Sequence, residues 1–217
     1  MTPSVIAVLG GTGRVGREVV AQAVKAGHVV NVVSRSRERA MALPQPITVV
    51  DGDAPWPAVV DSAVAPADVV ISTLGHTKQS PDDLMTQAVT HAIAAMERHR
   101  VQRIVVLSCA SVRSDHDAAS TVQRLSGMFR NASLGAAAKD HAQQARILID
   151  SDLEWTLVRA PRIVDRTPSG NIARSLEPAN GGGDIGREDL AAFLLACAVN
   201  GLHIRETPSV RQAAEPR

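Results

Sequence analysis

The chain has 217 residues, a formal net charge of +1 and 45% hydrophobic residues. This length predicts one α/β domain with a substantial core, and the near-neutral charge without a basic run argues against nucleic-acid binding. The first apolar stretch is the short run 5–9, and no run reaches the length of a transmembrane helix. We therefore expect a cytoplasmic protein that binds neither nucleic acid nor membrane.

The absence of tyrosine restricts the possible chemistry. The chain has no tyrosine, two phenylalanines and two tryptophans. Any mechanism that needs a tyrosine general acid is excluded, including the Tyr-x-x-x-Lys pair that many dehydrogenases use. Stacking on a flavin or a nucleobase could use only the four aromatic residues, which are Trp56, Phe129, Trp155 and Phe193.

The two cysteines, Cys109 and Cys197, lie far apart in apolar surroundings. This spacing predicts reduced, mostly buried thiols rather than a disulfide framework. The adjacent residues Asp115, His116 and Asp117 rarely converge on one ion from neighbouring positions, so we predict no metal site.

The stretch 5–16, VIAVLGGTGRVG, carries the strongest motif of the chain. A short apolar run ends in glycine, and Gly10, Gly13 and Gly16 recur at intervals of three; with Gly11 they also satisfy G-x-G-x-x-G. A helical pattern follows at once. The arrangement predicts a strand, a tight turn and a helix start that bind the pyrophosphate of a dinucleotide. The alternative is a turn whose glycines serve geometry alone. The expected cofactor contacts of this turn are Gly10, Thr12, Gly13, Arg14, Val15 and Gly16.

Strands and helices alternate along most of the chain. The expected strands are 5–9, 29–34, 47–50, 68–72, 103–108 and 154–158, and the expected helices are 14–26, 37–43, 56–64, 80–99, 134–150 and 187–199. The helix 80–99 is expected to begin with Ser80 as its N-cap and Pro81 as its first residue. This alternation predicts an α/β protein with a single doubly wound parallel sheet, a Rossmann fold.

The predicted division of the chain is a dinucleotide-binding domain over 1–205 and a polar tail over 206–217. Two long loops, 108–133 and 159–183, are expected to form a substrate pocket or lid, because ligands bind at the carboxyl ends of the strands. Within the tail, residues 208–210 could form an edge strand.

The end of the strand 29–34 usually discriminates NAD from NADP. An acidic residue there would bind the ribose hydroxyls and repel a 2′-phosphate. This chain has Ser34-Arg35 instead, with Arg39 four residues on, and a guanidinium group matches a phosphate. Arg14 could add positive charge to the same corner. We predict NADPH over NADH; the alternative, surface arginines at an exposed helix start, suits Arg37 better than Arg35.

Together these motifs resemble the atypical short-chain dehydrogenase/reductase superfamily, in its NmrA-like branch of NAD(P)H-binding proteins. The resemblance is greatest to the biliverdin reductase B/flavin reductase group, whose turn GATGxxG is similar to GGTGRVG. The resemblance implies cofactor contacts in four segments: Ser34-Arg35 with Arg39 for the 2′-phosphate, Gly52-Asp53 for the adenine, Leu74-Gly75-His76-Thr77 beside the nicotinamide ribose, and Ser108-Cys109-Ala110-Ser111 near the nicotinamide.

Two catalytic residues, Ser111 and His141, are also implied by the resemblance. His141 precedes SDLEWTLVRAP at a spacing similar to the family's histidine, and Ala137 stands where the superfamily tyrosine would be. Ser111 could orient the nicotinamide amide or the substrate, and His141 could donate a proton or contact ribose. The alternatives are a serine that satisfies loop backbone and a surface histidine.

The implied activity is an NADPH-dependent reductase that transfers hydride to a flavin, quinone, bilin or similar conjugated acceptor. Such acceptors can take their proton from solvent, so the missing tyrosine does not forbid reduction. The alternative is a non-catalytic NADP(H)-binding redox sensor of the NmrA-like type. The missing tyrosine argues against a third possibility, an isomerase or epimerase. We expect a monomer or a weak homodimer whose partner is the small-molecule acceptor.

Overall fold

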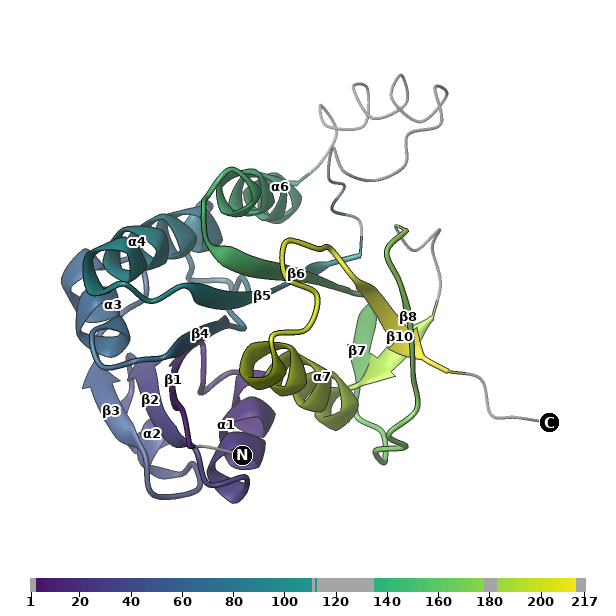
Figure 1. Ribbon diagram of the computed structural model, residues 1–217, viewed down its shortest axis with the longest axis horizontal. Coiled ribbons are helices and arrows are strands. Elements are labelled where there is room, and N and C mark those ends of the chain that lie inside the picture. Colours follow the sequence, from purple (N-terminus) through teal and green to yellow (C-terminus); the bar gives the residue numbers. More distant parts are fainter. Residues whose placement is uncertain (1–2, 111, 113–134, 178–182, 214–217) are drawn as a thin grey trace.

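The computed structural model describes residues 3–110, 112, 135–177 and 183–213. Its main sheet has eight strands in the order β3-β2-β1-β4-β5-β6-β10-β8 (Figure 1). These strands are β1 (Val5–Leu9), β2 (Val29–Ser34), β3 (Thr48–Asp51), β4 (Val69–Ser72), β5 (Arg103–Cys109), β6 (Glu154–Ala160), β8 (Ile172–Ser175) and β10 (Ser209–Gln212). All neighbours from β3 to β10 pair in parallel, and β8 pairs antiparallel to β10. The predicted α/β doubly wound sheet is confirmed, with one antiparallel edge strand.

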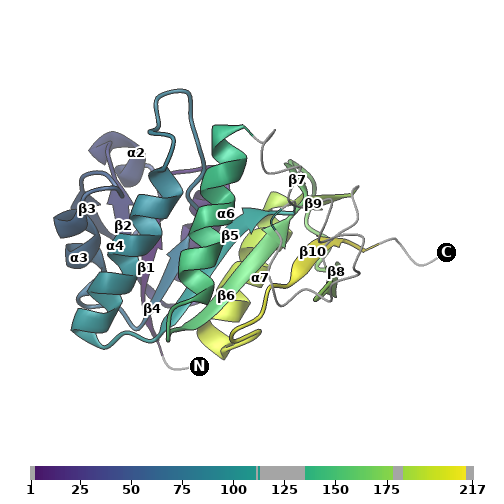
Figure 2. The same cartoon turned by 90° about the horizontal axis from the view of Figure 1, so that it is seen from above.

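Helices cover both faces of this sheet. The helices are α1 (Gly16–Lys25), α2 (Arg37–Met41), α3 (Pro57–Val64), α4 (Leu84–His99), α6 (Ala136–Ile149) and α7 (Arg187–Asn200). Helices α1 and α7 pack together on one face, whereas α3, α4 and α6 lie side by side on the other (Figures 1 and 2). The central strands are therefore buried on both faces, which explains their continuous apolar sequences. Within the described ranges, no helix is long and apolar enough to cross a membrane.

The start of α4 differs from its predicted position. The expected N-cap, Ser80, accepts a hydrogen bond from the Thr77 N–H at 3.0 Å and returns its own N–H to the Thr77 carbonyl. These bonds close a separate turn, and the helix begins only at Leu84. The prediction of a helix from Ser80 was therefore wrong, because Ser80 bonds to Thr77 in a turn of the preceding loop instead of capping the helix.

The segment 159–183, expected to be mostly loop, contains further strands. Strand β7 (Arg162–Val164) pairs with β9 (Asp184–Gly186) in a small second sheet, and β8 joins the main sheet. The tail also differs from its expected polar, edge-strand character: β10 lies between β6 and β8, and Val210 is fully buried. The core contact of Val210 and pairing on both sides explain why this short strand is held inside the sheet.

A buried carboxylate on α7 fixes the segment after β7. Asp189 accepts hydrogen bonds from the N–H groups of Ser169 at 3.0 Å and Gly170 at 2.9 Å, and from the Gln212 amide at 3.0 Å. Burial would raise the pKa of Asp189, but these hydrogen bonds outweigh burial and hold its pKa below the ordinary value. The predicted substrate segment is thus anchored to both α7 and β10.

Candidate functional site

The glycine turn, residues 10–16, lies at the carboxyl end of β1. The Gly13 N–H donates to the Gly10 carbonyl at 2.9 Å, and Gly10 has a φ of +83°. A Cβ on Gly16 would lie 2.1 Å from the Gly10 oxygen, a distance that no relaxed backbone allows. Val15, at the N-cap of α1, has no side chain that caps the helix. The turn therefore leads into a helix N-terminus that has no side-chain cap, a position at which proteins can bind phosphate.

The predicted 2′-phosphate residues meet at the neighbouring corner of the sheet. The Arg39 guanidinium donates to the Thr12 carbonyl of the glycine turn at 2.9 Å. Arg35, at the end of β2, lies 3.6 Å from the Asp53 carboxylate, and its side chain is half exposed. Because β2 lies between β1 and β3, these four residues come together although they are scattered over 42 positions, from 12 to 53.

The predicted catalytic His141 stands on α6, and its side chain contacts the carboxyl end of β5. Its Nδ1 is 3.1 Å from the hydroxyl oxygen of Ser108, which is buried. Burial lowers the pKa of His141, the Asp140 carboxylate raises it by less, and the neighbouring His76 also lowers it. The imidazole is consequently neutral at neutral pH. The alternative, a surface histidine, does not fit this half-buried, hydrogen-bonded side chain.

Sequence reasoning missed Asp140, the residue that precedes this histidine. Its carboxylate accepts from His76 Nε2 at 2.8 Å, from the Met85 N–H at 2.8 Å, and from the Thr86 N–H and hydroxyl at 2.9 and 2.5 Å. The side chain of Asp140 is only 1% exposed. By the polar crevice we mean these two hydrogen-bonded pairs of side chains, Ser108–His141 and His76–Asp140.

The remaining predicted residues contribute less. Leu74 packs against the core cluster beneath the sheet edge, and its N–H lies against Gly10. Gly75 is exposed, with open space where a side chain would project. The predicted catalytic residue Ser111 lies outside the described residues, as does most of the loop 108–133.

Aromatic side chains are scarce around the site. Trp155 and Phe193 are buried in the two core clusters, and Phe129 lies outside the described residues. Trp56 is 62% exposed, but it follows β3 rather than β5. Among the described residues, an acceptor at the carboxyl end of β5 has no aromatic partner from that strand.

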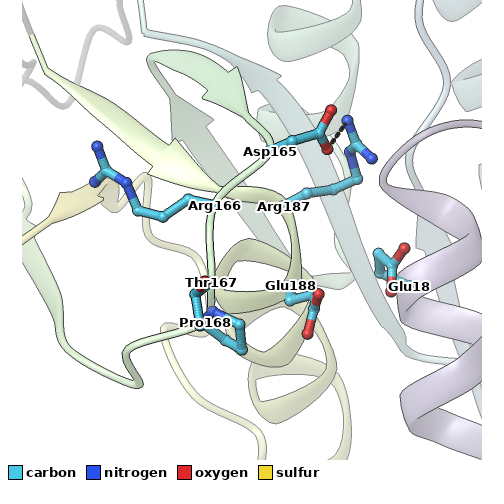
Figure 3. A pocket seen from close by; sticks show the side chains of 7 residues that line it. All are labelled: Glu18, Asp165, Arg166, Thr167, Pro168, Arg187 and Glu188. Carbon is cyan, nitrogen blue, oxygen red and sulfur yellow. Dashed lines mark ion pairs between the residues drawn. The ribbon is translucent and has the colours of Figure 1, made fainter.

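A cavity of about 480 Å³ lies between α1, α7 and the segment after β7 (Figure 3). It is lined by Glu18, Asp165, Arg166, Thr167, Pro168, Arg187 and Glu188. Asp165 pairs with Arg187 and lies 3.9 Å from Arg14 of the glycine turn. We expected Arg14 to add positive charge beside Arg35. Its guanidinium instead lies near the Asp165 carboxylate, which belongs to the predicted substrate segment.

A family model described as NAD(P)H-binding matches residues 10–200. The chain belongs to this NAD(P)H-binding family. Several solved structures resemble this protein over nearly its whole length. An NADP complex of a short-chain dehydrogenase/reductase from Veillonella parvula has a TM-score of 0.74 and 17% identity, covering 98% of this chain and 96% of that one.

Two further structures have the same fold. ChuY, an anaerobilin reductase from Escherichia coli O157:H7, has a TM-score of 0.77 and 22% identity, with 100% of both chains covered. A candidate NAD-dependent epimerase/dehydratase from Bacillus halodurans has a TM-score of 0.78 and 18% identity, covering 98% of this chain and 96% of that one. At these identities the likeness establishes the Rossmann-like fold, and the family match establishes NAD(P)H binding.

Proposed function

We propose that this NAD(P)H-binding protein is an NADPH-dependent reductase that transfers hydride to a flavin, quinone, bilin or similar conjugated acceptor. The observation that carries the proposal is the hydrogen bond between Ser108 and a neutral His141, at the same sheet edge as the glycine turn. It gives a tyrosine-free chain a polar pair in the place where a ligand of this fold reacts.

The glycine turn depends on its glycines because a Cβ on Gly10 or Gly16 would meet neighbouring backbone atoms at 3.0 Å or less. In this compact turn the backbone at the start of α1 would hold the pyrophosphate. In this proposal the cofactor contacts are Gly10, Thr12, Gly13, Arg14, Val15 and Gly16 for the pyrophosphate, Arg35 and Arg39 for the 2′-phosphate, Asp53 for the adenine, and Leu74, Gly75, His76 and Ser108 for the nicotinamide ribose. NADPH is favoured over NADH because a guanidinium stands at the end of β2 where a carboxylate would repel the phosphate. When bound, NADPH supplies the hydride.

The chain's own part in the reaction is to orient groups and to hold a proton. In the tautomer with a protonated Nε2, His141 accepts a hydrogen bond from the Ser108 hydroxyl at Nδ1, and its Nε2–H donates to a ribose hydroxyl or to the acceptor. Because burial keeps this imidazole neutral, the proton consumed by the acceptor comes ultimately from solvent. Ser111 would orient the nicotinamide amide or the acceptor.

The known structures support this proposal in two ways. A protein of the same fold binds NADP, and ChuY is a bilin reductase that matches the full length of this chain. We propose that the protein belongs to the biliverdin reductase B/flavin reductase branch, and a bilin reductase of the same fold supports this proposal.

The test is NADPH oxidation in the presence of a panel of flavin, quinone, bilin and aldehyde acceptors, with NADPH binding measured in parallel. We expect oxidation with at least one conjugated acceptor and none with simple aldehydes, whose reduction needs a positioned acid. Tight NADPH binding without turnover on any acceptor would favour the NADP(H) sensor. In the same assay, the variant His141→Gln is expected to bind NADPH but to oxidise it more slowly than the wild type.

A further inference from the structure

The Asp140 carboxylate connects three segments of the chain. It stands on α6, it accepts hydrogen bonds from two N–H groups in the first turn of α4, and it accepts a third hydrogen bond from His76 in the loop after β4. Asp83, the N-cap residue of α4, makes no side-chain capping bond. Asp140 therefore supplies the cap of α4 from another helix, which satisfies N–H groups at the positive end of the helix dipole.

The hydrogen bonds of Asp140 determine the tautomer of His76. Both carboxylate oxygens accept two hydrogen bonds each, and three of the four donors are Met85 N–H, Thr86 N–H and the Thr86 hydroxyl. A carboxylate surrounded by such donors acts only as an acceptor, so His76 donates from Nε2. In the neutral imidazole, Nδ1 is then left as a hydrogen-bond acceptor.

His76 is placed beside the dinucleotide site by the same loop. Two residues before it, the Leu74 N–H lies 3.0 Å from the position of a Cβ on Gly10, so the loop after β4 is packed directly against the glycine turn. Thr73 adds a hydroxyl that donates to the Gly10 carbonyl at 3.3 Å. The His76 side chain is 18% exposed, and it lies where ligands of this fold bind, outside the carboxyl ends of β1 and β4.

We infer that Asp140 is a positioning residue for NADPH: it holds His76 as the Nε2–H tautomer so that Nδ1 accepts a hydrogen bond from a hydroxyl of the bound dinucleotide. This inference rests on the proposed NADPH binding. Asp140 touches neither cofactor nor acceptor and acts through His76. Since His141 follows it on α6, the first turns of this one helix align both histidines of the polar crevice.

A double-mutant cycle on NADPH affinity tests the inference. The dissociation constant is measured for the wild type, His76→Ala, Asp140→Asn and the double variant, together with the thermal midpoint of each. His76→Ala is expected to weaken binding by about 3- to 10-fold, the worth of one hydrogen bond. Asp140→Asn should weaken it similarly, because its amide N–H groups face donors. The double variant should bind no more weakly than His76→Ala, because Asp140 acts only through the imidazole.

Thr86→Val is the matched control. It removes one donor from the same carboxylate but leaves the contact with His76, so it should lower the thermal midpoint and leave NADPH affinity within about twofold. If Asp140→Asn fails to fold, Asp140→Glu replaces it in the cycle, because the added methylene displaces the carboxylate from His76. Nitrogen NMR of the wild type should also show the His76 proton on Nε2.

Three results would overturn the inference. One is a double variant whose loss equals the product of the single losses, and another is Asp140→Asn that lowers the thermal midpoint without changing NADPH affinity. Either leaves NADPH binding by the wild type intact, so the proposed function would survive. A wild type that does not bind NADPH would overturn both.

Discussion

The glycine turn and the polar crevice lie at the same edge of the sheet but are built in opposite ways. The turn is made of backbone from seven consecutive residues, closed by a Gly13 to Gly10 hydrogen bond. The crevice is made of side chains whose hydrogen bonds join residues 33 and 64 positions apart. In the proposed function, the turn recognises the phosphates that all dinucleotides share, whereas the crevice supplies the groups on which the reaction depends.

The two regions also differ in their exposure to solvent. The arginines around the turn are open to water, with side-chain exposures of 51% for Arg35 and 72% for Arg14. In the crevice, Asp140 is almost completely buried and His141 is kept neutral by burial. In the proposed function, charged side chains are thus exposed where phosphate would bind, and charge is disfavoured by burial where a proton would be held.

The largest effect is expected from breaking the turn. Gly16→Ala places a Cβ 2.1 Å from the Gly10 oxygen and 2.7 Å from the Thr73 hydroxyl, so the backbone must move. We expect NADPH binding to weaken by about 100-fold or more, measured by titration calorimetry. Gly135→Ala is the control, because nothing lies within 4 Å of its new Cβ and its φ of −62° suits alanine. Equal NADPH affinity of the two variants would contradict the assigned role of the turn.

The corner beside the turn should determine which cofactor is bound. Arg35→Ala removes a charge-assisted contact with the 2′-phosphate, so the dissociation constant of NADPH should rise by about 10- to 30-fold while that of NADH stays within about twofold. Arg37→Ala removes the same charge two residues away, from a side chain that pairs with Asp51 at 3.2 Å. If both variants, or neither, changed the ratio of the two affinities, Arg35 would not be the discriminating residue.

In the crevice, the burial of His141 should be visible in the pH dependence of stability. Its folded-state pKa lies below the ordinary value of 6.5, so the unfolded chain takes up this proton first as the pH falls. As the pH falls below about 6.5, the free energy of unfolding of the wild type therefore decreases. His141→Gln should lose less stability, and the two slopes should differ by at most about 1.4 kcal/mol per pH unit. Denaturant unfolding at about pH 7.5 and about pH 5.5 measures the difference. Parallel pH profiles would mean that His141 is not buried in its neutral form.

The smallest effect is expected where the turn meets the segment after β7. In the proposed site Asp165 would compete with phosphate for Arg14, so Asp165→Asn should strengthen NADPH binding by about 2- to 5-fold at low salt. Asp184→Asn, in which the lost charge faces Arg162 and Arg166 instead, should leave NADPH affinity unchanged. Weaker NADPH binding by Asp165→Asn would indicate that the carboxylate is needed to hold Arg14 in place.

The contrast between the two regions also explains what the sequence could predict. The turn, the parallel strands and Arg35 follow from local patterns, since glycine spacing and apolar runs are encoded within a few residues. The cap of α4 could not be found in this way, because Asp140 supplies it from a distant helix while Ser80 offers a plausible local signal. The one available signal was a carboxylate four residues before Gln144 and eight before Leu148, on the buried face of α6.

The partial strands of the segment 159–183 were missed for a similar reason. Strands β7 and β9 have three residues each, too few for an alternating pattern to be recognised. The polar sequence of β10 contains a single buried apolar residue, Val210, and its pairing partners are remote in the chain. Tertiary pairing, not local propensity, determines these elements.

In the proposed function, the turn binds NADPH and the crevice supports hydride transfer from it. Single-turnover oxidation of saturating NADPH, with a flavin or bilin acceptor, tests this claim directly in the wild type, Arg35→Ala and His141→Gln. We predict that the wild type oxidises NADPH, that Arg35→Ala retains the rate once saturated, and that His141→Gln binds NADPH normally but reacts about 10-fold more slowly. Tight NADPH binding by the wild type with no oxidation by any conjugated acceptor would contradict the account.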